Sequence, residues 1–174
     1  MQGYKFNHGF TLLELIVSMT VLAILLGIAV PSFMSTLDKR RLSGAAEQLY
    51  SDLQYARSEA IKRNTPVFVT FTGAGTTWCY GIATAVCTCT TANNCQLDGV
   101  TKVVDQTGFR GVSLSDFTNV NFGPRRGTVA VNRTAEFTSN GRTVRVVTSQ
   151  LGRVKMCSIA GAGYISGYPE CPAN

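Results

Sequence analysis

The spacing of apolar residues divides the chain into one long N-terminal run and a remainder of short alternating runs. Residues 10–30 are almost continuously apolar, and Glu14 is their only formal charge. As an α-helix this run would be about 30 Å long, which matches the hydrocarbon core of a bilayer. We therefore expect a membrane-spanning helix over residues 10–30, with a single acid near its start.

A second apolar pattern predicts that the helix continues as far as residue 63. Its apolar positions recur every three or four residues; they are Leu42, Ala45, Ala46, Leu49, Leu53, Ala56 and Ala60. Pro31 removes one backbone hydrogen bond, so a kink is expected there. Asn64, Thr65 and Pro66 are expected to end the helix. The segment 31–63 is thus predicted to be amphipathic, with its apolar stripe packed on a sheet.

From Val67 onward the alternation has a period of two, which is typical of strands. The predicted strands contain residues 67–71, 78–82, Val120 with Phe122, Val129 with Val131, Val144 with Val146, and residues 153–157. Asn140-Gly141 predicts a hairpin turn, and the Thr-, Asn- and Cys-rich stretch 83–106 predicts a long loop. The expected fold class is α+β, with the long helix laid across an antiparallel sheet in a globular domain over residues 64–174.

Six cysteines lie in the predicted globular domain: Cys79, Cys87, Cys89, Cys95, Cys157 and Cys171. Clustered cysteines in a small domain behind a membrane helix favour disulfides in an oxidising compartment. A zinc site is the alternative, but Cys87-Thr88-Cys89 lacks the usual two-residue gap, and the only histidine is His8. We therefore expect no metal. We predict a Cys157–Cys171 disulfide, and we expect Cys87 and Cys89 each to pair with Cys79 or Cys95.

Positive charge is concentrated late in the chain. Between positions 125 and 155 there are seven basic residues and one acid, Glu136. The local difference of +6 equals the net charge of the whole chain. The basic residues are Arg125, Arg126, Arg133, Arg142, Arg145, Arg153 and Lys155. On a strand, Arg153 and Lys155 would share one face. Such a face fits phosphate contacts along DNA. A solvated basic face, or one that contacts an acidic neighbouring subunit, is the alternative.

The sequence contains no convincing catalytic motif. It has no phosphate-binding Gly-rich loop, no clear carboxylate pair and no nucleophile motif. We expect that the protein is not an enzyme and that it needs no cofactor.

Gly9-Phe10-Thr11-Leu12-Leu13-Glu14-Leu15, placed after a short basic leader over residues 1–9, resembles the class III signal of type IV pilins and type II secretion pseudopilins. This resemblance implies that a prepilin peptidase cuts between Gly9 and Phe10 and that Phe10 is then methylated. It also implies that Glu14 guides assembly by neutralising the N-terminal amine of a neighbouring subunit. Pro31 falls where such pilins commonly carry a proline.

The segment QYARSEAIKRNTPV, residues 54–67, and Gly152-Arg153-Val154-Lys155 are similar to the GspH/FimT branch of minor pilins and minor pseudopilins. The resemblance implies a pilin-like fold, a place at or near a filament tip, and other pilins or pseudopilins as partners. Some FimT-type pilins bind DNA through a late GRxR motif. In this chain Lys155 stands in place of the last arginine of that motif. Lysine keeps the charge but cannot make the two parallel hydrogen bonds of a guanidinium. Arg142, Arg145, Arg153 and Lys155 are accordingly candidates for contacts with double-stranded DNA.

The expected location is the inner membrane, with the globular domain in the periplasm, and then a pilus or a secretion pseudopilus. Lys39, Arg40 and Arg41 favour the opposite orientation by the positive-inside rule, but the leader and the cysteines favour the periplasm. The alternative to a prepilin leader is an ordinary secretory signal peptide that is cut after Ala29. The sequence does not distinguish a pilus from a secretion system.

Overall fold

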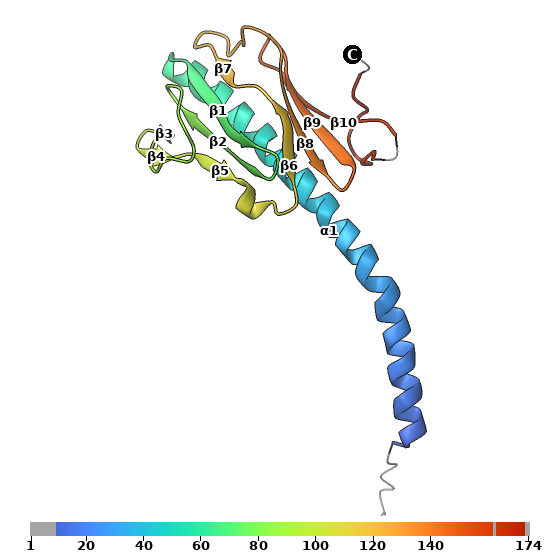
Figure 1. Cartoon of the computed structure of the whole chain (residues 1–174). Coiled ribbons are helices and arrows are strands. Elements are labelled where there is room, and N and C mark those ends of the chain that lie inside the picture. Colours follow the sequence, from blue (N-terminus) through green and yellow to red (C-terminus); the bar gives the residue numbers. More distant parts are fainter. Residues whose placement is uncertain (1–9, 162, 173–174) are drawn as a thin grey trace, which may run out of the picture. The chain divides into compact units, whose positions relative to one another are not determined.

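The computed structural model describes residues 10–161 and 163–172 (Figure 1). The predicted leader, including Gly9 of the predicted cleavage site, lies outside the described residues. The chain divides into two compact units between Leu37 and Asp38, and each unit is described by itself below.

Helix α1 spans Leu12–Arg63, and its residues as far as Leu37 belong to the first unit. Large apolar side chains are exposed all along this part of the helix, from Leu12 to Met34. The helix is long and apolar enough to cross a membrane. It continues through Pro31, so the proline does not end it. The predicted kink stays a prediction.

In the second unit, α1 buries one face. All seven predicted stripe residues, from Leu42 to Ala60, are at most 2% exposed. The helix ends at Arg63, where the Asn64 N–H donates to the Ile61 carbonyl oxygen at 3.2 Å. Asn64 has a left-handed φ of 51°, a conformation that commonly follows the last helical turn. The predicted apolar stripe and helix end are confirmed.

In the described residues, ten strands form two four-stranded sheets and one small ribbon. The first sheet has the order β5-β2-β1-β7, the second has the order β10-β9-β8-β6, and β3 pairs with β4. The strands are β1 (Val67–Ala74), β2 (Thr77–Ala83), β3 (Gln96–Leu97), β4 (Val100–Thr101), β5 (Val103–Asp105), β6 (Ser113–Phe117), β7 (Val120–Phe122), β8 (Arg133–Ser139), β9 (Arg142–Thr148) and β10 (Val154–Ser158). Every ladder between them is antiparallel. The α+β class is confirmed, but the expected single sheet is two sheets.

Trp78 joins the two sheets inside the core. It lies on β2 of the first sheet, and its ring meets Phe137 of the second sheet edge-on at 5.2 Å. Its indole N–H donates to the Val112 carbonyl oxygen at 2.9 Å. Because the polar tip of this buried ring has a partner, its desolvation cost is offset. Both sheets and the α1 stripe belong to one apolar cluster.

The hairpin between β8 and β9 turns at Asn140 and Gly141, which have φ values of 47° and 73°. Positive φ at both central residues is the requirement of the tight turn that Asn-Gly favours. The hairpin that this dipeptide predicted is confirmed.

Three sequence-based expectations need correction. Val129 and Val131 form no strand; Val129 is buried and its N–H donates to the Gln150 carbonyl oxygen at 2.9 Å, so its apolar side chain reflects packing between loops. The stretch 83–106 is not a plain loop, because it contains β3, β4 and β5, and β5 is an edge of the first sheet. Arg153 precedes β10 and does not lie on it.

Three disulfides are present: Cys79–Cys89, Cys87–Cys95 and Cys157–Cys171. The third is the predicted pair, and Cys87 and Cys89 bond to Cys95 and Cys79, within the expected choices. Two bridges therefore pin the stretch after β2, and the third ties the C-terminal loop to β10.

Arg63, the last residue of α1, also fixes this stretch. Its guanidinium pairs with Glu59 one turn earlier and with Asp98 in the turn between β3 and β4. The hydrogen bonds from Arg63 hold the pKa of Glu59 below its ordinary value of 4.5, and that of Asp98 below 3.8. The end of the helix and the Cys-rich stretch are thus joined by charge as well as by chain.

We expect Asp98→Asn to reduce stability at neutral pH and to have little effect in strong acid. A carboxyl group whose pKa is lower in the folded state stabilises the fold at pH values above its unfolded pKa. This stabilisation is lost as the pH falls through the folded pKa. Thermal melts of both proteins from pH 7 down to about pH 2 measure this. A melting-temperature gap that stays constant down to the lowest pH would contradict the assignment.

Candidate functional site

The start of α1 has the geometry of a capped helix. The Glu14 N–H donates to the Thr11 hydroxyl at 3.2 Å, and Glu14 lies in the first helical turn. Thr and Glu three residues apart form the sequence of a capping box, and an acid in the first turn complements the helix dipole. Glu14 and Phe10 are both exposed. The cap therefore leaves the carboxylate accessible to a group from outside this chain.

Two of the four candidate DNA contacts lie on β9, where they point to opposite faces. Side chains alternate between the two faces of a strand. Val144 and Val146 are buried, so Arg142 lies on the same inner face as they do, and Arg145 lies on the outer face. Arg145 donates to Glu136 of β8 from Nε at 3.0 Å and from Nη2 at 2.8 Å. Its charge is therefore neutralised by the one acid in the basic region.

Contacts with α1 define two ends of the domain. At the Asp38 end, Asn140 of the β8–β9 turn donates to Asp38, and Lys39 donates to Ser166 at 3.1 Å. At the Arg63 end, Arg57 donates to the Leu151 carbonyl oxygen at 3.2 Å. Asp38 and Arg57 are about 29 Å apart along an α-helix.

The candidate basic residues are divided between these ends. Arg142 begins β9 beside the Asn140 turn, at the Asp38 end. Arg153 and Lys155 lie just past the Leu151 turn, toward the Arg63 end, and both are exposed. Among residues 10–161 and 163–172, no carboxylate pairs with either of them. The four candidates therefore do not form one compact patch.

A contact between two glycines brings other arginines to Arg153. A Cβ added at Gly152 would lie 1.8 Å from the Gly127 carbonyl oxygen, so the two backbones touch directly. Gly127 follows Arg125 and Arg126, which are both exposed. The contact places the Arg125-Arg126 loop beside the turn that carries Arg153. We call Arg125, Arg126, Arg153 and Lys155 the Arg63-end cluster.

Arg125 and Arg126 are among the basic residues counted along the chain, but nothing in the sequence makes them neighbours of Arg153. The available signal was a glycine directly beside each basic group, at positions 127 and 152. Both glycines have positive φ, 60° and 73°. Such glycines mark tight loops, although nothing in their spacing says that the loops meet.

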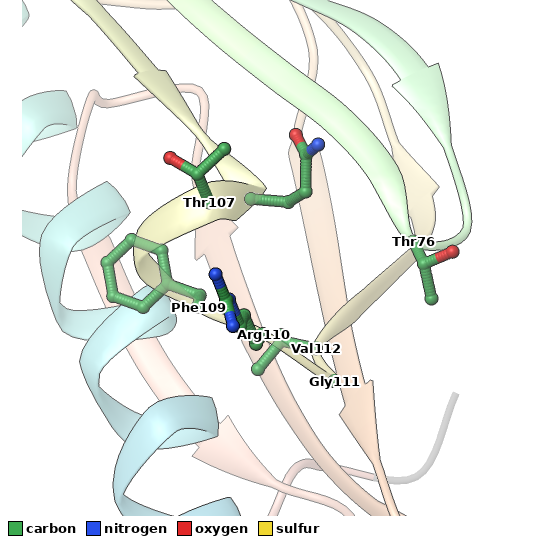
Figure 2. A pocket seen from close by; sticks show the side chains of 7 residues that line it. Thr76, Thr107, Phe109, Arg110, Gly111 and Val112 are labelled. Carbon is green, nitrogen blue, oxygen red and sulfur yellow. The ribbon is translucent and has the colours of Figure 1, made fainter.

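A pocket of about 280 Å³ lies at the Asp38 end. It is lined by Thr76, Gln106, Thr107, Phe109, Arg110, Gly111 and Val112. Figure 2 shows the Arg110 guanidinium beside the Phe109 ring, with Thr107 and Thr76 at the rim. A Cβ added at Gly44 would lie 3.4 Å from the Phe109 ring, so this wall of the pocket packs on α1. In Figure 2 the Thr76 hydroxyl points away from Arg110, so the polar groups of the lining do not converge on the guanidinium.

Tyr80 is buried, and its hydroxyl is hydrogen-bonded to the half-buried Asp52 of α1. The Tyr80 hydroxyl donates to Asp52 Oδ2 at 2.7 Å, and burial, reinforced by the nearby Asp52 charge, raises the pKa of Tyr80 well above its ordinary value. The two residues line a pocket of about 170 Å³ together with Thr101 and Lys102. It joins β2 to α1, and we assign it a structural role.

All six cysteines are in disulfides, and within residues 10–161 and 163–172 no group of His, Cys, Asp or Glu could hold a metal ion. The described residues offer a capped helix start, exposed basic surfaces and several pockets, among them one of about 510 Å³ lined by Arg125 and Arg126.

Comparisons with known proteins agree with the two sequence resemblances. The model of the family described as type II transport protein GspH matches residues 45–152, which is more than half of the chain. The model described as the prokaryotic N-terminal methylation motif matches residues 4–30. None of the curated proteins matches the sequence.

Two solved structures are similar, and both are crystal forms of the type IV minor pilin FimU from Pseudomonas aeruginosa strain PAO1. The form in space group P21 is 23% identical, covers 67% of this chain and 88% of that chain, and has a TM-score of 0.49. The form in space group P65 is 21% identical, covers 66% and 91%, and has a TM-score of 0.48.

The glycine contact predicts a specific loss of stability. Gly152 and Gly141 have the same φ of 73°, but a Cβ at Gly141 would meet nothing within 4 Å. Gly141→Ala should therefore cost only the left-handed strain of about 1 kcal/mol. Gly152→Ala adds a collision with backbone and should cost roughly 3 kcal/mol.

Urea denaturation of the two variants and the wild type measures both costs. Equal destabilisation by the two alanines would mean that the Gly127–Gly152 contact does not hold the loops together.

Proposed function

The chain belongs to the GspH family of type II transport proteins, and on this premise we propose that it is a minor pilin or pseudopilin of a type IV pilus or a type II secretion filament. In this proposal it is a structural subunit and not an enzyme, it needs no cofactor, and it lies at or near the filament tip. The main support for this proposal is the N-terminal methylation motif, which stands at the start of a helix whose apolar side chains are exposed as far as Met34.

Exposed apolar side chains on every side of residues 12–34 need an environment that covers them. A bilayer covers them before assembly, and the equivalent helices of neighbouring subunits cover them in a filament. The helix therefore serves as membrane anchor and as assembly element in turn. Other pilins or pseudopilins are the partners that this surface requires.

The cleavage and assembly residues keep the roles that the leader implies. A prepilin peptidase cuts between Gly9 and Phe10 and methylates Phe10, which leaves a charged amine four residues before Glu14. The exposed carboxylate of Glu14 pairs with the amine of a neighbouring subunit. A buried pair of this kind is most useful for setting the register of one subunit against the next.

In this proposal the protein starts in the inner membrane with residues 64–174 in the periplasm. The three disulfides support this side of the membrane, because such bonds persist in oxidising compartments. Residues 38–63 belong to the same compact unit as this domain, so they lie in the periplasm with it.

Intact mass and N-terminal sequencing of the protein from native membranes and from sheared filaments test this proposal. We expect a chain that begins at methylated Phe10 in both fractions. An N terminus at Val30, after a cut by signal peptidase, or an uncut Met1 would overturn it.

Glu14→Gln is the matched variant, since it keeps the shape of the side chain and removes its charge. It should be processed and should remain in the membrane fraction, but it should be missing from sheared filaments. Normal incorporation of the variant would remove the proposed role of Glu14 and leave the processing result intact.

Binding of double-stranded DNA is a second candidate function, which the Arg63-end cluster favours. Arg125, Arg126, Arg153 and Lys155 are exposed, and two backbones in contact hold their loops together. Fixed cations on one surface suit backbone phosphates, which contribute most of the affinity of non-specific DNA binding. Arg145 contributes less than the sequence suggested, because Glu136 pairs with it.

Titrating a DNA duplex with the full chain at several salt concentrations tests this function. The double variant Arg126→Gln with Arg153→Gln should reduce the slope of log affinity against log salt by about 2, since each lost phosphate contact removes about 1. The matched control is Arg40→Gln with Arg110→Gln, which removes the same charge at the Asp38 end and should leave the slope unchanged. No binding at low salt, or equal loss in both variants, would rule out the cluster as a DNA site.

A further inference from the structure

Three large apolar side chains are exposed at the Arg63 end of the second unit. Ile61 is 44% exposed, Val131 46% and Leu151 73%. Single exposed aliphatic residues are ordinary on a protein surface, so their meaning depends on whether they lie together. We use the name Leu151 face for a surface made of these three residues and three arginines, Arg57, Arg126 and Arg153.

Contacts between the helix end and two loops join this face. A Cβ added at Gly127 would lie 3.1 Å from Ile61 Cδ1, so the last turns of α1 touch the loop that carries Arg126. From the same part of α1, Arg57 donates to the Leu151 carbonyl oxygen at 3.2 Å. Ile61 and Leu151 therefore lie on either side of the Arg57 side chain.

Gln150 connects Val131 to the same surface. Its backbone N–H donates to Asn132 Oδ1 at 3.0 Å, and its Nε2 donates to the Ala130 carbonyl oxygen at 3.4 Å. Val131 stands between these two partners, and Leu151 follows Gln150 directly. The three exposed apolar residues are therefore neighbours, although they come from three separate segments.

The arginines of the Leu151 face have no acid beside them. In the described part of the chain, no carboxylate pairs with Arg57, Arg126 or Arg153. The buried Nε of Arg57 also has no hydrogen-bond partner there. Arg125 and Lys155, which belong to the same end, are exposed and equally without a paired carboxylate. The positive charge of this face is therefore not neutralised within the described residues.

The acids of α1 near this end are engaged by other groups. Glu59 pairs with Arg63, and Asp52 accepts from the hydroxyl of Tyr80 on the first sheet at 2.7 Å. Neither acid makes an ion pair with an arginine of the Leu151 face among the described residues.

Acids on the other elements are also paired or distant. Asp98 pairs with Arg63, and Glu136 of β8 pairs with Arg145. The one further acid in the strands of the second sheet is on β6, at the sheet edge opposite β10. Positive charge is therefore in local excess at the Leu151 face.

A pocket beside this face is suited to a carboxylate. Its volume is about 510 Å³, and it is lined by Gly123, Pro124, Arg125, Arg126 and Thr128. Two guanidinium groups and a hydroxyl thus stand around one hollow. A guanidinium can bind a carboxylate through two parallel hydrogen bonds. The side chain of an Asp or Glu from outside this chain fits this lining.

The apolar side chains favour protein over DNA as the partner of this face. Contacts with DNA phosphates come from cationic and hydrogen-bonding groups, so Ile61, Val131 and Leu151 add nothing to them. The same side chains stabilise a protein complex when an apolar side chain of the partner covers them. Arginine is also enriched at protein interfaces, in which an apolar centre lies within a polar rim.

We propose that the Leu151 face binds an acidic segment of another protein that also carries an apolar side chain. The apolar side chain packs against Ile61 and Leu151. Carboxylates on either side of it pair with Arg126 and Arg153, and one of them enters the pocket. The proposal goes beyond the filament function, because none of its steps depends on the membrane-length helix.

Photo-crosslinking of the full chain in its own cells tests the proposal. The crosslinker p-benzoylphenylalanine replaces Ala130, which is exposed beside Val131, and mass spectrometry identifies the crosslinked material. We expect a peptide of another protein in which Asp or Glu residues flank an apolar residue. A crosslink to DNA, to a second copy of this chain or to a segment without acids, or no crosslink at all, would overturn the proposal.

Leu151→Asn separates the apolar contribution from the charge. The variant keeps every arginine, and because Leu151 is exposed it should fold normally. It should reduce the crosslink yield about tenfold, as expected for a side chain at the centre of an interface. The matched control is Val86→Asn, at a residue that is 70% exposed in the Cys-rich stretch, and it should leave the yield unchanged. Equal yields from Leu151→Asn and the wild type would contradict an apolar contact.

Charge exchange tests the pairing directly. Arg126→Glu with Arg153→Glu should abolish the crosslink, and replacing the acids of the crosslinked segment by lysine should restore it, because exchanging both signs restores complementarity. Absence of this rescue would reject the paired charges.

The same cells distinguish this proposal from the filament function. If sheared filaments contain the chain but no crosslink forms, the Leu151 face loses its partner and the filament function stands. If the crosslink forms but the chain is missing from filaments, the filament function falls and the partner of the Leu151 face stands.

Discussion

The packing of one helical stripe against two sheets is the contact on which the rest of the domain depends. Four of the seven stripe residues are alanines, and all seven are buried. Small side chains let the strands approach the helix closely, and interiors at this density tolerate little change of volume. Leu53 lies where Phe71 and Val120 of one sheet face Ala135 and Val146 of the other. The helix is therefore the element that holds the two sheets at a fixed spacing.

The direction of that helix also decides how charge is distributed. One set of arginines gathers where α1 enters the domain, and another set gathers where α1 ends. These ends are about 29 Å apart along the helix, several times the screening length of about 8 Å in physiological salt. The charges at the two ends therefore act independently of each other. A single net charge for the domain describes neither of them.

Patterns within one element were predictable from the sequence, and contacts between elements were not. The stripe from Leu42 to Ala60 follows from helical period, and the β8–β9 hairpin follows from the left-handed preference of Asn140-Gly141. The split into two sheets depends on which strands pair, and that information is not in the alternation of any one strand. Val129 and Val131 have the period of two and yet form no strand, so this period alone does not establish a strand.

The four basic residues that were predicted to contact DNA do not form one surface, for the same reason. Whether Arg145 is free depends on the register that puts it opposite Glu136, and register is a property of two strands. The nearness of Arg126 to Arg153 depends on Gly127 touching Gly152, two loops that are far apart in the sequence. Charge counted along the chain found the right region but assigned the wrong neighbours.

The stretch from Ala83 to Cys95 is held differently from the rest of the domain. Its cysteines form a small cluster separate from the main core, and two covalent bridges fix its backbone. Exposed side chains there, such as Thr90 and Ala92, carry little of the folding free energy. Their identity can drift while the frame beneath them stays constant. This stretch can therefore present many different surfaces on one scaffold without loss of the fold.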